Sequence, residues 1–438
     1  MFENLISQSA AGLLMDDISS GRLPPSILFY GPPAEGKMTA ALELARALSC
    51  RSGNAPWACD CRDCALHRSL THPDLAITGP RDCILEIRAS AAALLASRAP
   101  GAPGGIPRKT AARFLFARSI RKLTARFSPE LNDGDDARLA RAMPLLASIA
   151  ETLEEFETMV DADDCDADSL GKTVSTLVES AAKLEDDFLP DGVPVNVIRN
   201  AASWARLTPY GRKKVLIVEN ADRMQDSARN AFLKILEEPP RDAVFILTTS
   251  RRGAIIPTIL SRVRTYAFVE RQAKDREEVV SRVFRDTLPP GESLSGYFDR
   301  FLPVSPEAIR AGARAFLSLV LSEALDASLA PLVSLPSALE AAFAVPGNAA
   351  PARDSTTIPS VVSSLNKCKP AKVWRLFLTE IMAVLSASVR TGQVSARESL
   401  VYASWLESVR VAQTSVDILN ISPTQALERL SYEMKEAL

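Results

Sequence analysis

The sequence has 438 residues, and its 51 lysine and arginine side chains nearly balance 53 aspartates and glutamates. A chain of this length exceeds one ordinary hydrophobic core and indicates about two to four domains. The formal net charge of -2 excludes a basic surface spread over the whole protein, so any contact with nucleic acid must be local or shared with a partner.

The sequence begins Met1-Phe2-Glu3-Asn4, with no basic region ahead of an apolar stretch. The apolar region 316–345 is interrupted by prolines and acidic residues. Both patterns differ from those of secretory and membrane-spanning segments. We therefore expect a cytoplasmic protein without a membrane span.

A short apolar strand is predicted at Ser26–Tyr30, and a helix is predicted at Thr39–Leu48. The loop between them fits the pattern G-x-x-x-x-G-K, with Gly31, Gly36 and Lys37 at its fixed positions. In this setting backbone N–H groups and the start of the helix hold phosphate oxygens, and the lysine reaches the outer phosphates. The sequence therefore predicts a phosphate-binding loop.

The residue after the lysine argues against firm binding of Mg-ATP. A hydroxyl normally binds Mg²⁺ at this position, but Met38 has none. Thr39 follows one residue late and points about 100° away around a helix. A retained structural turn without nucleotide is therefore the alternative to an ATP site.

Four of the seven cysteines, Cys50, Cys59, Cys61 and Cys64, are clustered at the spacing C-x8-C-x-C-x2-C. In a cytosolic chain such clustering favours zinc over disulfides. The alternatives are a reduced thiol cluster without metal, or a site in which His67 or His72 replaces Cys59.

Residues 81–192 interrupt the alternation of strands and helices. An Ala/Gly/Pro-rich linker is predicted at 89–107, followed by three amphipathic helices around 116–127, 149–160 and 170–188. The first helix is basic and the second ends acidic, so we expect them to pair with each other. A solvated helical outgrowth is the simpler interpretation, and an arm that binds DNA or a partner is the alternative.

A buried strand is predicted at 213–220, and it ends in Glu219-Asn220. An ATPase needs a carboxylate for Mg²⁺ at the first of these positions and a carboxylate that orients or deprotonates water at the second. Glu219 could contact a metal, but the amide of Asn220 cannot accept a proton. Loss of a positioned general base typically costs about 10²- to 10⁴-fold in rate.

The segment 231–240 reads Ala-Phe-Leu-Lys-Ile-Leu-Glu-Glu-Pro-Pro, and a strand-like run leads into Ser261-Arg262-Val263. With the phosphate loop, the cysteine cluster and His72-Pro73-Asp74, these segments resemble the AAA+ core of bacterial clamp-loader subunits of the delta-prime and tau/gamma type. That family has Ser-Arg-Cys where this chain has Val263. The resemblance covers about residues 1–80 and 193–272 and, more weakly, 273–438.

The resemblance implies an α/β fold: an AAA+ parallel sheet with flanking helices, followed by a small helical lid and an all-α collar. The implied domains are a core, a lid and a collar. The core covers 1–272 and includes a zinc module at 50–64 and the insertion at about 81–192. The helical lid and the start of the C-terminal region cover 273–345, and the helical collar covers 346–438. The four cysteines would hold zinc, while Gly31, Gly36, Lys37, Thr39 and Glu219 would face any bound ATP.

The resemblance further implies a subunit of the DNA polymerase III clamp loader that acts as a stator. It would assemble with tau/gamma and delta subunits, act on the sliding clamp and primed DNA through that assembly, and lend Arg262 to a neighbour's ATP as an arginine finger. Its own ATP hydrolysis would be weak or absent. The alternatives are an active tau/gamma-type motor ATPase and a stand-alone zinc-dependent DNA-binding protein, which would leave Arg262 unexplained.

Overall fold

The structure is a computed structural model that describes residues 1–98, 105–132, 137–161, 166–302, 304–326, 370–391, 395–417 and 421–437. The chain divides into two compact units, 1–298 and 299–438. The domain boundary predicted between residues 345 and 346 lies outside the described residues.

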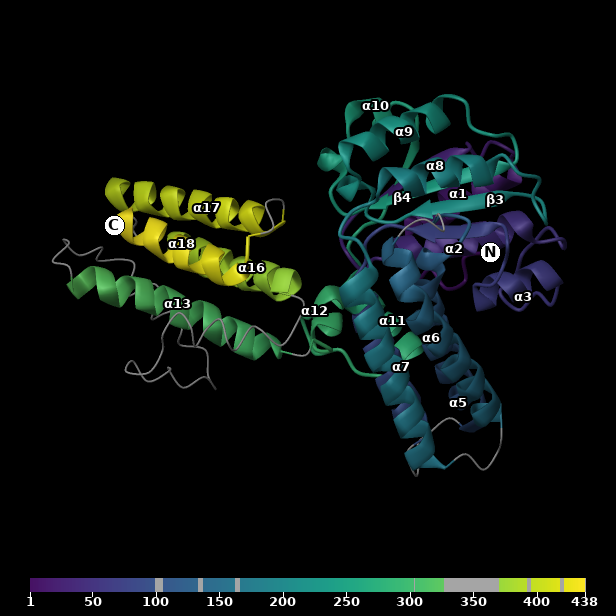
Figure 1. Ribbon diagram of the computed structural model, residues 1–438, viewed down its shortest axis with the longest axis horizontal. Helices are drawn as coiled ribbons and strands as arrows, with labels where there is room; N and C mark the ends of the chain where they lie inside the picture. The colour runs from purple at the N-terminus through teal and green to yellow at the C-terminus, as the bar shows by residue number, and fades with distance from the viewer. Residues whose placement is uncertain are drawn as a thin grey trace. The chain divides into compact units, whose positions relative to one another are not determined.

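The first unit is built on a parallel sheet of five strands: β1 (Ser26–Tyr30), β2 (Leu75–Thr78), β3 (Lys214–Val218), β4 (Ala243–Thr249) and β5 (Arg264–Ala267). Their order is β2-β3-β4-β1-β5, and every neighbouring pair is parallel (Figure 1). β1 therefore lies between two strands that come more than 200 positions later in the sequence.

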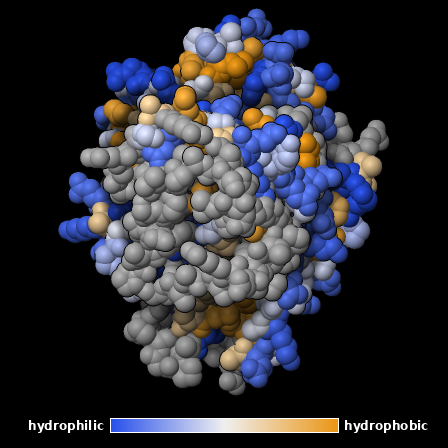
Figure 2. All heavy atoms as spheres, turned by 90° about the vertical axis from the view of Figure 1, so that its left-hand side faces the viewer, coloured by the Kyte–Doolittle hydropathy of each residue, from blue (hydrophilic) through white to orange (hydrophobic). Residues whose placement is uncertain are grey.

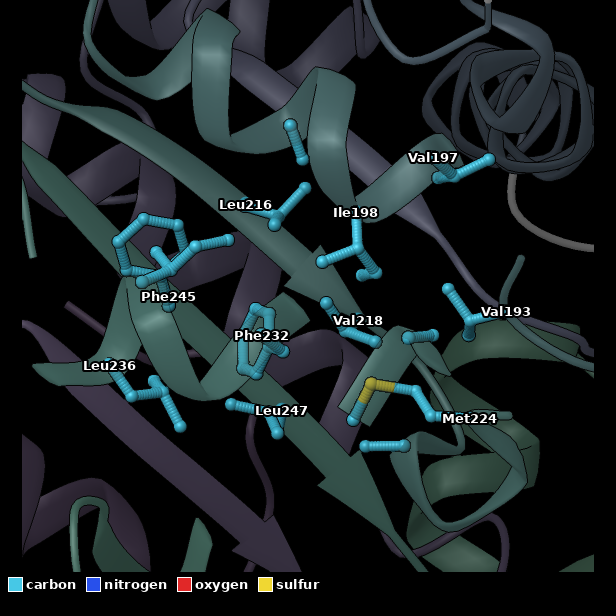
Figure 3. Packing of buried hydrophobic residues seen from close by; sticks show 14 of the residues in the cluster. Val193, Val197, Ile198, Leu216, Val218, Met224, Phe232, Leu236, Phe245 and Leu247 are labelled. Atoms are coloured by element: carbon cyan, nitrogen blue, oxygen red, sulfur yellow. The ribbon is translucent and has the colours of Figure 1, made fainter. Parts of the chain in front are cut away.

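Helices cover both faces of the sheet, because successive strand residues point to opposite sides. Leu28 of β1 joins the core under α8 (Val195–Ala205), α9 (Asp226–Glu237) and α10 (Pro257–Leu260). Figure 3 shows this core, in which Phe232 of α9 packs against Phe245 of β4. On the other face, Ile27 and Phe29 pack against α1 (Ser9–Ser19) and α2 (Lys37–Ser49).

Between β2 and α8 the chain forms a helical outgrowth with its own core, which we call the α4–α7 bundle (Figure 1). It comprises α4 (Cys83–Arg98), α5 (Gly105–Thr124), α6 (Ala137–Asp161) and α7 (Ala167–Phe188), with the 3₁₀ turn η1 (Ala125–Phe127). The three amphipathic helices predicted from the sequence are confirmed. The linker predicted from residue 89 is wrong, since α4 continues to Arg98, in keeping with the high helix propensity of alanine and leucine.

The predicted pairing of basic and acidic helices is confirmed at one contact, between Arg121 of α5 and Glu157 of α6 (2.7 Å). Other basic residues of α5 and η1 form ion pairs with elements other than α6. Lys122 pairs with Glu86 of α4, and Arg126 pairs with Glu219 beyond the end of β3. The basic face thus fastens the bundle to the sheet as well as to α6.

The 3₁₀ turn η3 (Arg252–Ala254) lies between β4 and α10. After the sheet come α11 (Ala273–Val279), the π-helical turn η4 (Val280–Phe284) and α12 (Leu294–Asp299). The second unit contains α13 (Pro306–Asp326), α16 (Pro370–Thr391), α17 (Ala396–Asp417) and α18 (Pro423–Glu436). Trp405 of α17 donates its indole N–H to the Met434 carbonyl of α18 (2.8 Å), which ties these two helices together. The predicted helical C-terminal region is therefore confirmed.

On the face shown in Figure 2, hydrophilic and hydrophobic side chains of the described residues are interspersed. Within the described residues, none of the helices combines the length and the hydropathy that crossing a bilayer requires.

Candidate functional site

The phosphate loop follows β1, and two glycines fix its path. Gly31 has φ 146°, and a Cβ there would lie 2.0 Å from the carbonyl oxygen of Phe268. Gly36 has φ 91° and precedes the first turn of α2. A larger side chain at either position would displace the loop, so the predicted strand-loop-helix geometry is present.

Lys37 turns its ammonium group back onto the loop. Its Nζ donates to the carbonyl oxygens of Gly31 (2.6 Å) and Pro32. Burial lowers the pKa of Lys37 to about 8, although the carboxylates of Glu219 and Glu35 oppose the shift. A phosphate would therefore have to draw the lysine away from two backbone oxygens.

This pKa gives a test of the loop geometry by stability measurements. Because the folded-state pKa lies below the unfolded value of 10.5, the unfolded chain binds more protons between these two values, and stability rises with pH across that window. We expect the melting temperature of the parent to rise relative to that of Lys37→Met between about pH 8 and pH 10. A difference that stays constant with pH would contradict the buried position of Lys37.

Met38 is buried in the core beneath α2, at 6% exposure, and Thr39 is half-buried one position further along the helix. The side chain at position 38 thus belongs to the packing of the fold. Its thioether also offers no oxygen to Mg²⁺, which prefers oxygen ligands.

Glu219 lies just beyond β3, and both of its carboxylate oxygens are engaged by guanidinium groups. Arg81 donates to Oε1 at 2.6 Å, and Arg126 donates to Oε2. The side-chain amide of Asn220 donates to the Pro80 carbonyl at 2.6 Å. Together with Met38, these contacts leave positions 38, 219 and 220 unsuited to hold a divalent metal in the way an ATPase requires.

Three residues with side-chain hydroxyls, Thr248-Thr249-Ser250, stand at the end of β4. The Thr249 hydroxyl donates to Asp222 at 2.7 Å and accepts the backbone N–H of Arg251 at 2.9 Å. Arg251 also pairs with Asp222 at 2.8 Å. The Thr249 hydroxyl therefore caps the turn that follows β4, which is a common use of serine and threonine side chains.

The four clustered cysteines converge between α2 and α3 (Arg62–Ser69). The Sγ atoms of Cys50, Cys59, Cys61 and Cys64 all lie within 4.8 Å of one another, and those of Cys50 and Cys59 are 3.7 Å apart. Tetrahedral zinc with bonds of about 2.3 Å needs sulfur atoms about 3.8 Å apart. The geometry of the cluster therefore fits a zinc ion, and the Cys59 sulfur lies within the cluster despite the shortened spacing.

Neighbouring residues preorganise this cluster. A hydrogen bond with Ser52 lowers the pKa of Cys59 to about 6, which favours the thiolate, whereas burial raises that of the Cys64 thiol well above its usual range. Buried Arg46 donates to the carbonyls of Ala55 and Pro56 (2.8 and 2.9 Å) and contacts Cys64 Sγ at 3.4 Å. This guanidinium thus holds the cysteine loop against α2.

The two histidines have other contacts. Their rings are stacked with centroids 4.1 Å apart, His67 shares a hydrogen bond with Ser49 (2.8 Å), and His72 accepts the backbone N–H of Asp74 (3.1 Å). Among the described residues, the group whose geometry could hold a metal ion consists of the four cysteines and includes neither histidine.

Arg262 follows α10, so the predicted strand-like run before it is wrong and a short helix takes its place. Its guanidinium donates to Glu237 at 2.8 Å and to the Thr258 carbonyl at 2.9 Å, and the side chain is 35% exposed. Glu237 belongs to the Leu-Glu-Glu-Pro-Pro segment, so the two motifs that the sequence analysis paired are in direct contact.

Sequence reasoning missed Arg81 and Arg126. They are separated from Glu219 by 138 and 93 positions. The basic character of residues 108–126 was a signal for Arg126 alone, since Arg81 lies outside that segment. Nothing in that signal indicates which acidic residue Arg126 meets.

A strand-loop-helix with the pattern G-x-x-x-x-G-K at β1, in a parallel sheet of order β2-β3-β4-β1-β5 with a helical C-terminal region, is the layout of an AAA+ protein. A family model described as "DNA polymerase III, delta subunit" matches residues 6–128 and 174–272, just over half of the chain. The chain belongs to this family of clamp-loader subunits, as its motifs predicted. Between its two segments the match omits residues 129–173, a narrower gap than the insertion predicted at 81–192.

Curated relatives share shorter segments. The chain is 34% identical over 92 residues to DNA polymerase III subunit delta' of Bacillus subtilis, covering 20% of this chain and 28% of that protein. It is 25% identical over 262 residues to subunit tau of the same organism, covering 56% and 41%. These matches thus span less than half of each relative.

A solved structure is also similar, a DNA polymerase III gamma subunit-related protein of Thermotoga maritima. It is 20% identical, with a TM-score of 0.29, and the match covers 60% of this chain and 90% of that one.

Proposed function

We propose that this chain is a clamp-loader subunit of DNA polymerase III that acts as a stator. In this role it assembles with tau/gamma and delta subunits and helps them load the sliding clamp on primed DNA. The observation that carries the proposal is the contrast between two sites. The chain's own metal position is filled by arginine, whereas Arg262 is partly exposed beside Glu237.

Arg262 has the chemistry of an arginine finger. Its planar guanidinium presents several N–H donors, which suit the oxygens of a phosphoryl group during transfer. In the isolated chain this group pairs with Glu237, whose side chain is 53% exposed. An exposed ion pair contributes little to stability, so exchange of Glu237 for a neighbour's phosphate has a small energetic cost.

Reconstitution tests the proposal. The purified chain is mixed with candidate tau/gamma and delta subunits, and the product is analysed by size-exclusion chromatography with light scattering. A stable assembly that contains this chain supports the stator function, and its absence contradicts it.

An active motor subunit is the second candidate, and the strand-loop-helix geometry around Gly31, Gly36 and Lys37 is the observation in its favour. Against it, we expect the isolated chain to turn over ATP far below about 1 s⁻¹, the lower end for ordinary enzymes. A coupled assay of phosphate release at saturating Mg-ATP measures this rate. Turnover at or above that value would favour the motor function.

Restoring the missing groups with Met38→Thr and Asn220→Glu has a structural cost. Asn220 has φ 50° and ψ 52°, a left-handed conformation that asparagine tolerates and glutamate does not. We expect the substitution at 220 to cost about 1–2 kcal/mol for that reason. Thermal melting of Asn220→Glu beside Asn220→Gly, which removes the side chain but keeps the conformation, measures this cost.

A further inference from the structure

Glu219, the acidic residue after β3, lies in a chain of ion pairs that the α4–α7 bundle supplies. Arg81, which precedes α4, bridges Glu219 (2.6 Å) and Glu86 (2.6 Å), and Lys122 of α5 binds the second oxygen of Glu86. Arg126 of η1 binds the second oxygen of Glu219. We propose that Arg81 and Arg126 are specificity-determining residues that close the phosphate-loop site to divalent metal ions.

Burial makes these contacts persistent. The side chain of Arg126 is 1% exposed and that of Glu219 is 10% exposed. Burial alone would raise the pKa of Glu86, but the charges of Lys122 and Arg81 lower it to about 2. Charge-assisted hydrogen bonds screened from water are stronger than exposed ones. A metal ion would have to displace a guanidinium from Glu219 and then stand beside its positive charge.

The fold sets the position of both arginines. Arg126 also donates from Nε to the carbonyl of Gly79 (3.1 Å), at the end of β2, so η1 is attached next to the strand that pairs with β3. Arg81 lies two residues beyond Gly79 in the same connection. Docking of the bundle therefore places both cations at Glu219, independently of the substitutions at positions 38 and 220.

Arg81 can be removed without leaving a buried acid unpaired. Glu219 keeps Arg126, and Glu86 keeps Lys122. Arg121 provides a matched control, because it also forms an ion pair with a glutamate of another element and its side chain is likewise 23% exposed. The test uses three proteins: Met38→Thr, Met38→Thr with Arg81→Ser, and Met38→Thr with Arg121→Ser. Circular dichroism establishes that each is folded.

Each protein is titrated with a fluorescent ATP analogue in excess Mg²⁺ and again in excess EDTA. In Met38→Thr and in the Arg121→Ser control, we expect Mg²⁺ to change the affinity by less than about twofold. With Arg81→Ser, Mg²⁺ should strengthen binding by about 10- to 100-fold, the range by which residues around a metal affect its binding.

Two results would overturn the inference. If Mg²⁺ strengthens binding to Met38→Thr itself, the arginines do not close the site. If no protein gains dependence on Mg²⁺, Arg81 is not the barrier. The inference deepens the proposed function, in which this chain does not need to hydrolyse ATP. The two tests are distinguishable, because binding of the ATP analogue reports on Arg81, whereas assembly of the complex reports on the stator function.

Discussion

Replacing Arg262 by alanine or lysine is expected to leave the reconstituted complex assembled while lowering ATP hydrolysis at the neighbouring site by about 10³- to 10⁵-fold. Lysine keeps the charge but loses the planar arrangement of donors, so it should not restore activity. Assembly should persist because the contact between Arg262 and Glu237 is partly exposed. DNA-dependent phosphate release and clamp loading measure the effect.

Arg282→Ala is the control, because Arg282 is 50% exposed and also lies near a glutamate, Glu278, at 4.0 Å. It should hydrolyse ATP like the parent complex. If both Arg262 variants assemble and match the parent in hydrolysis and loading, Arg262 has only a structural role and the stator mechanism is wrong.

Purified protein is expected to contain about one zinc ion, and its removal should unfold the cysteine loop. Bound metal replaces repulsion among converging thiolates with bonds, so its binding free energy contributes to folding. We expect Cys64→Ser to lose the metal and to melt several degrees lower, because each kcal/mol shifts the melting temperature of a large domain by about 2–4 °C. Elemental analysis and calorimetry measure the two effects.

Cys83→Ser is the matched control, since Cys83 is also buried and free but lies outside the cluster. It should keep about one zinc ion. Sub-stoichiometric zinc in parent protein prepared without chelators would contradict the prediction, as would an equal loss of metal from both variants.

Much of the core could be predicted because strands buried on both faces form continuous apolar runs. β1 and β3 have this pattern, and their positions agree closely with the strands predicted at 26–30 and 213–220. β5 has only four residues, Arg264–Ala267, and two of its side chains are polar. It was not predicted, because an edge strand of this length has no distinctive hydrophobic period.

The candidate site was only partly predictable, for a different reason. Spacing along the chain identifies Gly31, Gly36 and Lys37 because they act within one loop, and it identifies the cysteines because they lie close together in sequence. The partners of Glu219 come from distant positions, and their approach depends on how the α4–α7 bundle packs. Periodicity predicts that such helices exist but not which arginine meets which acid.

The strand order has a consequence for synthesis of the chain. β1 is complete at Tyr30, yet both strands that pair with it, β4 and β5, begin only at Ala243 and Arg264. At about 5–20 residues per second, β1 leaves the ribosome on the order of 10–40 s before its partners. The α4–α7 bundle needs no such wait, since its core comes from residues 83–189. We therefore expect the bundle to fold first and the sheet to close late, so that a chain halted before Ala243 exposes both edges of β1 to aggregation.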